Sequence, residues 1–386
     1  MENETIKEPS RVSNYWNRKL EYWKDQDPIA KMNRKKVCLR LVIFALCILS
    51  FAVITMIKNI SIDMQREQQV ARVWREDAVS SSQVSVFFDE TKKVDEMVVK
   101  RLKHSLLENL VGILNDTMYD PNNLDRTPFY IAYSGKGSAG ISVGKNTSNL
   151  AVYGVGGDFF TFHNLNLISG DYFYDGVNDE YVLLDSVSAF KLYGSNDIVG
   201  EKVEINKHEY TICGVYRVDS SNLMKKAGGE MGFVFMPYSA LLKDGAVMGI
   251  TCIEVAGESP TDDYLLEKVN ESIKTSFDDS EFETVQNTGR YGFINSVKVL
   301  KNYFYRSMRK NNVSFPYWEN IARTREDIYA FWLVIQAILL TVAVSMALVY
   351  IGYKYVHRTL TFKKIGDDLY DFSDSIRRRF KDRKKL

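Results

Sequence analysis

The sequence predicts a mixed α+β extracytoplasmic domain between two transmembrane α-helices. Three observations support this fold class: two long apolar segments without charge, basic residues concentrated on one side of each segment, and alternating strands and amphipathic helices between them. The average composition hides this segregation, because 50 Lys and Arg residues balance 49 Asp and Glu residues and 45% of the chain is hydrophobic. Such a balance excludes a disordered chain and a globally basic nucleic-acid-binding protein.

The first apolar segment runs from Leu41 to Ile57 and contains no charged residue. Residues 37–39 lengthen it to about 20 residues if the Arg40 side chain snorkels towards the headgroups. As a helix it would cross a hydrocarbon core of roughly 30 Å with its backbone hydrogen bonds satisfied. A cleaved signal peptide is the alternative, but about 40 polar residues precede the segment and no small-residue cleavage site stands before Lys58. We therefore predict a transmembrane helix at residues 38–57.

The second apolar segment, Ile328 to Tyr353, spans 26 residues without a charge. A buried core helix is the alternative, which the length of the segment and its aromatic ends disfavour. The aromatic residues at these ends are Tyr329, Trp332, Tyr350, Tyr353 and Tyr355. We predict the second transmembrane helix at residues 328–353.

Basic residues determine the predicted orientation in the membrane. Five Lys and Arg residues lie within residues 31–40, before the first span, against two within residues 58–67 after it. The segment after the second span, residues 354–386, is also strongly basic. The positive-inside rule then places both termini in the cytoplasm. Residues 1–37 and 354–386 are expected to be cytoplasmic, and residues 58–327 to form a large extracytoplasmic domain of a two-pass protein in the cell membrane.

The extracytoplasmic region opens and closes with a strand followed by a helix. Residues 82–88 alternate polar and apolar side chains, and residues 95–113 carry an apolar stripe at helical spacing. Near the other end a strand at residues 250–256 precedes a helix at residues 261–277. Short strands and turns fill the region between them. The two strand and helix pairs therefore enclose a β-rich insertion.

Patterns that suggest nucleotide binding or catalysis lack the structural context that they require. Gly135 to Gly140 matches the dinucleotide fingerprint, and Gly140 to Gly144 matches the nucleophile elbow, but neither is followed by a sequence that favours a helix. A turn-rich loop is the better interpretation of this segment. The sequence also lacks a Walker A motif, since Gly137 follows Lys136 where Ser or Thr is required.

The histidines show no spacing typical of paired metal ligands, and we expect them to lie at the surface. They are His104, His163, His208 and His357. No catalytic, cofactor-binding or metal-binding residue is predicted, and we expect a protein that is not an enzyme.

Two of the four cysteines, Cys38 and Cys47, belong to the first span, and two lie in predicted external strands. Oxidising conditions outside the cytoplasm would permit a disulfide between Cys213 and Cys252. Cysteines in strands are also often buried as free thiols. Both alternatives stay open from the sequence.

An ordered run of motifs resembles a known family. Residues 152–173 read VYGVGGDFFTFHNLNLISGDYF, residues 180–205 read EYVLLDSVSAFKLYGSNDIVGEKVEI, and residues 210–216 read YTICGVY. This run resembles the MacB-like periplasmic core domain of FtsX-type (MacB/LolC-like) ABC transporter permeases. The segment FVFMPYSAL at residues 233–241 is similar to the continuation of that family. One departure is the turn at residues 206–208, Asn-Lys-His, where the family often has glycine.

The resemblance implies a porter-like α/β part, built from the two strand and helix pairs, with a β-rich insertion at about residues 134–220. It also implies a membrane subunit of an ABC-type export or mechanotransmission system. In such a system the ectodomain binds or moves a peptide, lipid, lipoprotein or antibiotic, while a separate ABC ATPase supplies energy. Family permeases have four spans, and this sequence contains two predicted spans. We therefore expect an accessory or partial permease subunit that works with a separate ATPase and a four-span permease.

The predicted cytoplasmic segments carry amphipathic patterns. Before the first span, Tyr15, Trp16, Leu20 and Trp23 share one side of a helix, which predicts an interfacial helix. After the second span an apolar face and a basic run predict a surface that contacts the ATPase, anionic membrane lipid, or both. Its residues are Ile365, Leu369, Phe372, Ile376, Phe380, Arg377, Arg378 and Arg379.

The segment before the second span has two open interpretations. Phe293, Val297, Leu300 and Phe304 fit one face of a helix. This helix could form a stalk that joins the domain to the membrane, or it could pack on the domain core. For the whole chain, the alternative to a transporter subunit is a membrane-anchored receptor or scaffold without energy coupling. The oligomeric state is left open.

Overall fold

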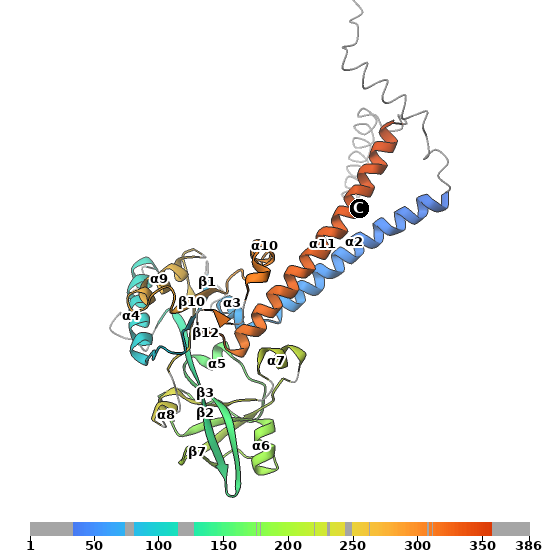
Figure 1. Cartoon of the computed structure of the whole chain (residues 1–386). Helices are drawn as coiled ribbons and strands as arrows, with labels where there is room; N and C mark the ends of the chain where they lie inside the picture. The colour runs from blue at the N-terminus through green and yellow to red at the C-terminus, as the bar shows by residue number, and fades with distance from the viewer. Residues whose placement is uncertain are drawn as a thin grey trace, which may run out of the picture. The chain divides into compact units, whose positions relative to one another are not determined.

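The computed structural model describes residues 34–73, 81–114, 127–174, 176–177, 179–219, 221–229, 232–243, 249–261, 263–306, 309–310 and 312–356. Its helices are α2 (Arg34–Asp63), η1 (Arg66–Gln68), α3 (Val70–Val73), α4 (Glu96–Leu114), α5 (Phe159–Phe162), α6 (Ser186–Tyr193), α7 (Asn222–Ala227), α8 (Tyr238–Lys243), α9 (Tyr264–Lys274), α10 (Phe293–Asn302), η2 (Tyr303–Tyr305) and α11 (Tyr317–Val356) (Figure 1). Its strands are β1 (Ser81–Phe88), β2 (Phe129–Val143), β3 (Asn146–Gly157), β4 (Leu167–Gly170), β5 (Tyr181–Asp185), β6 (Lys202–Ile205), β7 (His208–Tyr216), β8 (Val234–Pro237), β9 (Cys252–Glu258), β10 (Phe282–Gln286), β11 (Arg309–Lys310) and β12 (Val313–Ser314).

The chain forms two units, which are described separately: the described parts of residues 1–59 and 332–386, and residues 60–331. Within the described residues, two helices are long and apolar enough to cross a membrane, Cys38–Asp63 and Tyr317–Gly352. In the first unit one polar contact joins them, because Gln336 Nε2 donates to Thr55 Oγ1 at 2.8 Å. The predicted two-pass arrangement is confirmed.

Residues 60–331 are organised around one large mixed sheet. Its strand order is β10-β1-β9-β2-β3-β8-β5-β7-β4, and β6 pairs with both β2 and β7. The path β2-β3-β8-β5-β7-β6 therefore returns to β2 and closes into a small barrel. Apolar side chains of these strands fill its interior, among them Ile141, Val152, Leu184 and Ile212. The predicted mixed α+β fold is confirmed.

The other half of the sheet carries its helices on one face. Val84, Phe88 and Val255 point from β1 and β9 towards apolar residues of α4 and α9, including Leu102 and Leu265. These five side chains are fully buried. The two strand and helix pairs expected from the sequence are thus β1 with α4 and β9 with α9. The proposed insertion at about residues 134–220 stays a prediction, since the sheet is continuous across that boundary.

The turn-rich loop expected at Gly135 to Gly140 is wrong, because this segment lies inside β2. The strand continues because β3 pairs with it from Ala132 to Val143, with Gly135 opposite Gly154. The chain reverses only after Val143. Glycine lowers the propensity for a strand, but an uninterrupted ladder of backbone hydrogen bonds with β3 overrides that local preference.

The hairpin expected between residues 202–205 and 208–216 is present as β6 and β7. Its two central residues, Asn206 and Lys207, have positive φ angles of 47° and 73°. Positive φ at both positions defines a type I′ turn, whose twist matches that of the flanking strands. Lys207 therefore occupies a conformation that usually belongs to glycine.

The face of the sheet opposite α4 and α9 carries a cluster of aromatic residues. Tyr153 lies at its centre, with its ring 5.2 Å from that of Trp318 and 5.8 Å from that of Phe235. Phe233 and Tyr317 stack with an interplanar angle of 7°. Trp318 and Tyr317 belong to the first turn of α11, so this helix begins inside the domain core. We call these five residues the aromatic cluster.

The disulfide considered between Cys213 and Cys252 is wrong, since both thiols are free. Their strands, β7 and β9, are not neighbours in the sheet. Cys213 donates to the Val182 carbonyl at 3.3 Å, whereas Cys252 lies opposite Phe87 and Ser134. Burial raises the pKa of Cys213 to about 12 and also raises that of Cys252, so both stay protonated.

The predictions for the cytoplasmic segments lie outside the described residues. These include the interfacial helix at Tyr15, Trp16, Leu20 and Trp23, and the surface from Ile365 to Phe380. Both stay predictions.

Candidate functional site

Residues 60–331 bury several charged side chains between the sheet and the first turns of α11. His163 is 1% exposed and Arg290 is 3% exposed, and Glu254 and Glu319 are similarly buried. Ionisable residues are almost never fully buried unless they are paired, because taking a charge out of water is costly. These side chains form one connected network.

The sequence of β9 places one carboxylate on the side of the aromatic cluster. Alternate residues of a strand point to opposite faces. Cys252 and Ala256 pack on the side of the aromatic cluster, whereas Ile253 and Val255 pack against α4 and α9. Glu254 lies two residues from both Cys252 and Ala256, so it points to the same face as they do. Its side chain therefore points towards aromatic rings and needs a partner there.

That partner is His163, the residue that follows α5. Its Nε2 lies 2.5 Å from Glu254 Oε2, and its Nδ1 lies 3.8 Å from Glu67 Oε1. The imidazole also packs 4.5 Å from the Trp318 ring and 4.6 Å from the Phe159 ring. Burial lowers the pKa of His163, but the Glu254 and Glu67 carboxylates outweigh it and raise the pKa to about 10. His163 is thus a buried imidazolium between two carboxylates.

Two neutral side chains extend the network across β1. Ser85 Oγ donates to Glu254 Oε1 at 3.2 Å, and Asn287 Nδ2 donates to Ser85 Oγ at 2.8 Å. Arg290 Nη1 then donates to Asn287 Oδ1 at 2.9 Å. An unbroken series of hydrogen bonds therefore runs from His163 to Arg290.

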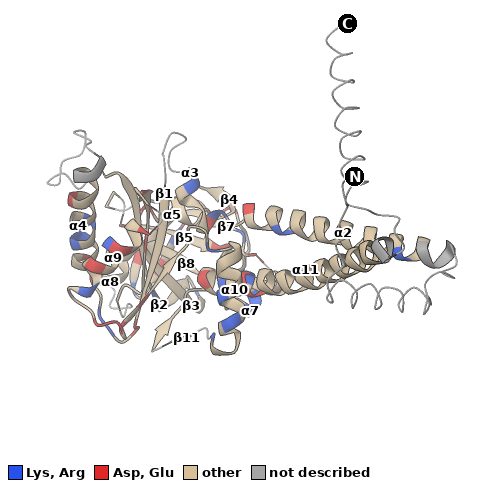
Figure 2. Ribbon diagram, turned by 90° about the horizontal axis from the view of Figure 1, so that it is seen from above, with Lys and Arg blue, Asp and Glu red and all other residues tan. Residues whose placement is uncertain are grey.

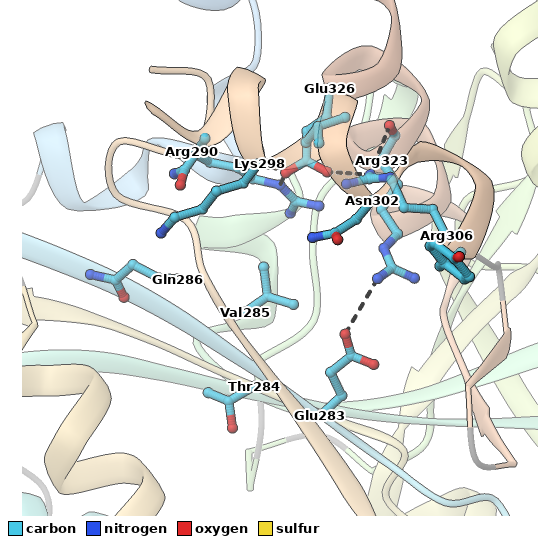
Figure 3. Close-up of a pocket in the computed structure, with 13 residues that line it drawn as sticks. Glu283, Thr284, Val285, Gln286, Arg290, Lys298, Asn302, Arg306, Arg323 and Glu326 are labelled. Atoms are coloured by element: carbon cyan, nitrogen blue, oxygen red, sulfur yellow. Dashed lines mark hydrogen bonds and ion pairs between the residues drawn. The ribbon is translucent and has the colours of Figure 1, made fainter. Parts of the chain in front are cut away.

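Arg290 connects this series to α11. Its Nη1 and Nη2 donate to the two carboxylate oxygens of Glu319, each at 2.7 Å. Its Nε donates to Glu326 Oε1 at 2.7 Å (Figure 3). Glu319 and Glu326 are two helical turns apart and so share one face of α11. Burial lowers the pKa of Arg290, but the two carboxylates raise it well above its usual value. The guanidinium is a permanent cation that holds two turns of α11.

Two further arginines surround this contact. Arg306 Nη2 donates to Glu326 Oε2 at 2.5 Å, and its Nε lies 3.0 Å from Asp327 Oδ1. Arg323 Nη2 donates to Glu283 Oε1 of β10 at 3.3 Å (Figure 3). Charges of opposite sign therefore alternate along the outer edge of the network, from the sheet to the last carboxylates of α11.

A polar cavity of about 500 Å³ lies beside these ion pairs. Residues of β10, α10, η2 and α11 line it, and the Lys298 side chain extends along it (Figure 3). Within the part of the chain that the structure describes, no group of three or more His, Cys, Asp or Glu residues could hold a metal ion. The cations and carboxylates are mutually paired, so the arrangement is suited to holding and releasing a helix.

A second contact ties the end of α2 to α11. Arg325 Nη1 donates to Ser61 Oγ at 3.0 Å, and the hydroxyls of Ser61 and Tyr329 lie 2.7 Å apart. The Tyr329 ring packs edge-on against Tyr291, with centroids 5.2 Å apart. Both apolar helices are therefore anchored to the domain by polar contacts at the points where they emerge from it.

The network was not predicted from the sequence. The expectation that His163 lies at the surface is wrong, because Glu254 and Glu67 compensate its charge in the core. One signal was available: Glu254 stands within the apolar strand CIEVA, where a carboxylate must find a partner. The partners come from distant segments, so sequence spacing could not identify them. Cys213 and Cys252 take no part in the network.

The chain is similar to one protein family and to two solved domains. The family model of the MacB-like periplasmic core domain matches residues 42–275. The periplasmic region of MacB from Actinobacillus actinomycetemcomitans is 15% identical, with 58% of this chain and 93% of that chain covered and a TM-score of 0.40. The extracellular domain of the noncanonic ABC-type transporter YknZ from Gram-positive bacteria is 12% identical, with 53% and 99% covered and a TM-score of 0.35. No curated protein sequence matches the chain.

The buried imidazolium predicts a specific dependence of stability on pH. The pKa of His163 in the folded chain, about 10, lies above the unfolded value of about 6.5. Its stabilising contribution is therefore complete below about pH 6.5 and is lost as the pH rises towards 10. The thermal unfolding midpoint of the detergent-solubilised chain should fall over this window, and His163→Gln should flatten the fall. His104→Gln, at an exposed histidine, should keep the wild-type slope. Equal slopes for all three proteins would contradict the assignment.

Removing the central cation should destabilise the domain strongly. Arg290→Met leaves Glu319 and Glu326 without their main buried partner, which should cost about 3–5 kcal/mol of unfolding free energy. Lys268→Met is the control, because it breaks a solvent-screened ion pair with the exposed Glu271 and should leave the unfolding midpoint almost unchanged. Thermal unfolding of both variants measures the difference. Similar midpoints would show that Arg290 does not hold α11.

Proposed function

Because the chain belongs to the MacB-like periplasmic core domain family, we propose that it is a mechanotransmission subunit of an ABC-type membrane system. The family is a component of ABC-type transporter permeases, and this chain is a two-pass membrane protein with a large domain of that kind. In the proposed function the domain binds or moves an envelope substrate of the peptide, lipid, lipoprotein or antibiotic class. A separate cytoplasmic ATPase supplies the energy, and a four-span permease is its membrane partner.

One observation carries the proposal: α11 is a single helix from Tyr317 to Val356. Its first turns lie in the buried network through Glu319 and Glu326, and its later turns form an apolar span. An α-helix is stiff along its axis because each turn is hydrogen-bonded to the next. A displacement of the span along the helix axis would therefore displace Glu319 and Glu326 by nearly the same distance.

The network offers alternative pairings that a displaced helix could use. Arg323 lies 3.3 Å from Glu283 on β10 and 3.6 Å from Glu319 on its own helix. A small shift of α11 would favour one carboxylate over the other. Ion pairs that exchange partners give discrete states, which is how small movements are converted into domain rearrangements. The sheet would sense the new state through Arg290 and the hydrogen bonds that lead to His163.

The proposed contact with the ATPase is the predicted cytoplasmic surface after the second span. Its apolar face runs from Ile365 to Phe380, and its basic run is Arg377 to Arg379. The proposed part that engages substrate is the β-rich insertion at about residues 134–220. The cytoplasmic location of both termini and the boundaries of these parts belong to the proposal.

Copurification tests the proposal directly. The tagged full chain, extracted gently from its native membranes, should bring down an ABC ATPase, and removal of residues 360–386 should release it. A chain that acts as a receptor or scaffold without energy coupling would bring down no ATPase and would keep its function after the same deletion. That result would overturn the transporter proposal.

Breaking α11 near the start of its apolar stretch should uncouple the complex without dissociating it. Phe331 is well exposed, so its side chain contributes little packing. Phe331→Pro removes the backbone donor to the Asp327 carbonyl and kinks the helix, at a cost of about 3 kcal/mol or more. We expect the ATPase to copurify but to lose any dependence of its rate on substrate.

Phe331→Ala is the matched control, because it removes the same ring and keeps the helix. It should retain the wild-type dependence of ATP hydrolysis on substrate. If the proline and alanine variants behave alike, a continuous α11 is not the coupling element.

A further inference from the structure

The segment α10–η2 exposes an unusual number of large apolar side chains. Phe304 is 92% exposed and Tyr305 is 88% exposed, and four other residues of the segment are also exposed. Contiguous exposed apolar surface on a folded domain marks an interaction site. We call this surface the aromatic ridge; it consists of Phe293, Ile294, Val297, Tyr303, Phe304 and Tyr305.

The ridge lies on the face of α10 that points away from the domain. Ser296 and Val299 are the buried residues of this helix. Phe293 and Val297 are one turn apart on a different face, and both are exposed. The helix therefore does pack on the domain, but through its small residues. Of the apolar stripe expected from the sequence, Phe293, Val297 and Phe304 are exposed, and Leu300 is half-buried.

The position of the ridge relative to α11 is fixed by Arg306, the residue that follows η2. Arg306 pairs with Glu326 and Asp327, which are the last charged residues before the uncharged stretch of α11 that begins at Ile328. In both general views α10 lies beside the first turns of α11, which belong to the same unit (Figures 1 and 2). The ridge thus lies next to the level at which α11 changes from charged to apolar, which is the outer boundary of the membrane span.

The chemistry of the ridge matches that boundary. Tyrosine and other aromatic residues concentrate at membrane interfaces, where a ring can be buried in the acyl region while its polar end stays wet. The same helix exposes two cations, Lys298 and Lys301, and residues 293–305 contain no Asp or Glu. Lipid phosphates would complement these lysines. A second copy of the same basic surface would repel them.

We propose that α10 and η2 form an interfacial membrane anchor. The aromatic ridge lies among the headgroups and upper acyl carbons of the outer leaflet, and Lys301 contacts lipid phosphates. The anchor holds the base of the domain on the membrane surface independently of the two spans. Arg306 links the anchor to α11. The anchor therefore stays at the membrane surface when α11 moves.

Quenching by brominated lipid tests the anchor in the full chain. Phe304→Trp places a reporter on the ridge, and Phe190→Trp is the matched control. Phe190 is also a well-exposed phenylalanine, at 64%, and its helix α6 lies at the opposite end of the domain from α10 (Figure 1). Each variant is reconstituted in phosphatidylcholine vesicles with bromines at shallow or deep acyl carbons, and wild-type emission is subtracted to remove the native tryptophans.

An interfacial helix buries its apolar face about 5–10 Å into the boundary between headgroups and acyl chains. The tryptophan introduced by Phe304→Trp should therefore be quenched, and more strongly by shallow than by deep bromines. The tryptophan introduced by Phe190→Trp should be unaffected. Since both sites are exposed, unchanged thermal midpoints are expected and serve as the check on folding. Equal quenching at the two sites, or none at position 304, would overturn the anchor and would leave a protein partner as the occupant of the ridge.

Discussion

The structure depends on the buried guanidinium of Arg290. It pairs with both carboxylates that α11 brings into the domain. Without it, Glu319 would keep only the longer contact with Arg323, at 3.6 Å, and Glu326 would keep only Arg306. Hydrophobic contacts such as those of Trp318 could hold the helix in several registers, because they are not directional. The bidentate geometry of the Arg290–Glu319 pair permits only one register of the helix. The cation therefore determines where the helix sits, and the aromatic cluster supplies the apolar burial around it.

The network extends to His163, so the ion pairs inside the sheet also depend on the position of α11. Buried ion pairs contribute little net stability, since desolvation offsets most of the attraction, but a broken pair is costly. A displacement of any residue of the network therefore raises the free energy of the residues that it pairs with. The neutral side chains of Ser85 and Asn287 pass this constraint across β1 through three hydrogen bonds, the outer two of which end on the Glu254 carboxylate and the Arg290 guanidinium. A domain held in this way favours a few well-defined arrangements over a continuous range.

Elements with a strong local signal were predictable, and the network was not. The two spans followed from uncharged apolar stretches, and the turn at Asn206 and Lys207 followed from its position between two alternating strands. The strand through Gly135 was missed because its pairing with β3, and not its own propensity, determines its conformation. His163 was misplaced for a similar reason: its partner Glu254 is far away in sequence, and only the folded sheet brings the two side chains together.

The length of α11 has a mechanical consequence. At 1.5 Å per residue, about 16 Å of the helix lies between Tyr317 and Asp327, and about 39 Å lies in the uncharged stretch from Ile328 to Tyr353. A rigid rod that pivots at the boundary between them by about 10°, well within the range of helix tilts in membranes, moves its inner end by about 7 Å and its outer end by about 3 Å. In the proposed mechanotransmission, such a lever would reduce a displacement at the far end of the span to roughly one hydrogen-bond length. Since the Arg290 contacts are 2.7 Å long, that reduced displacement matches the distance over which they engage or release.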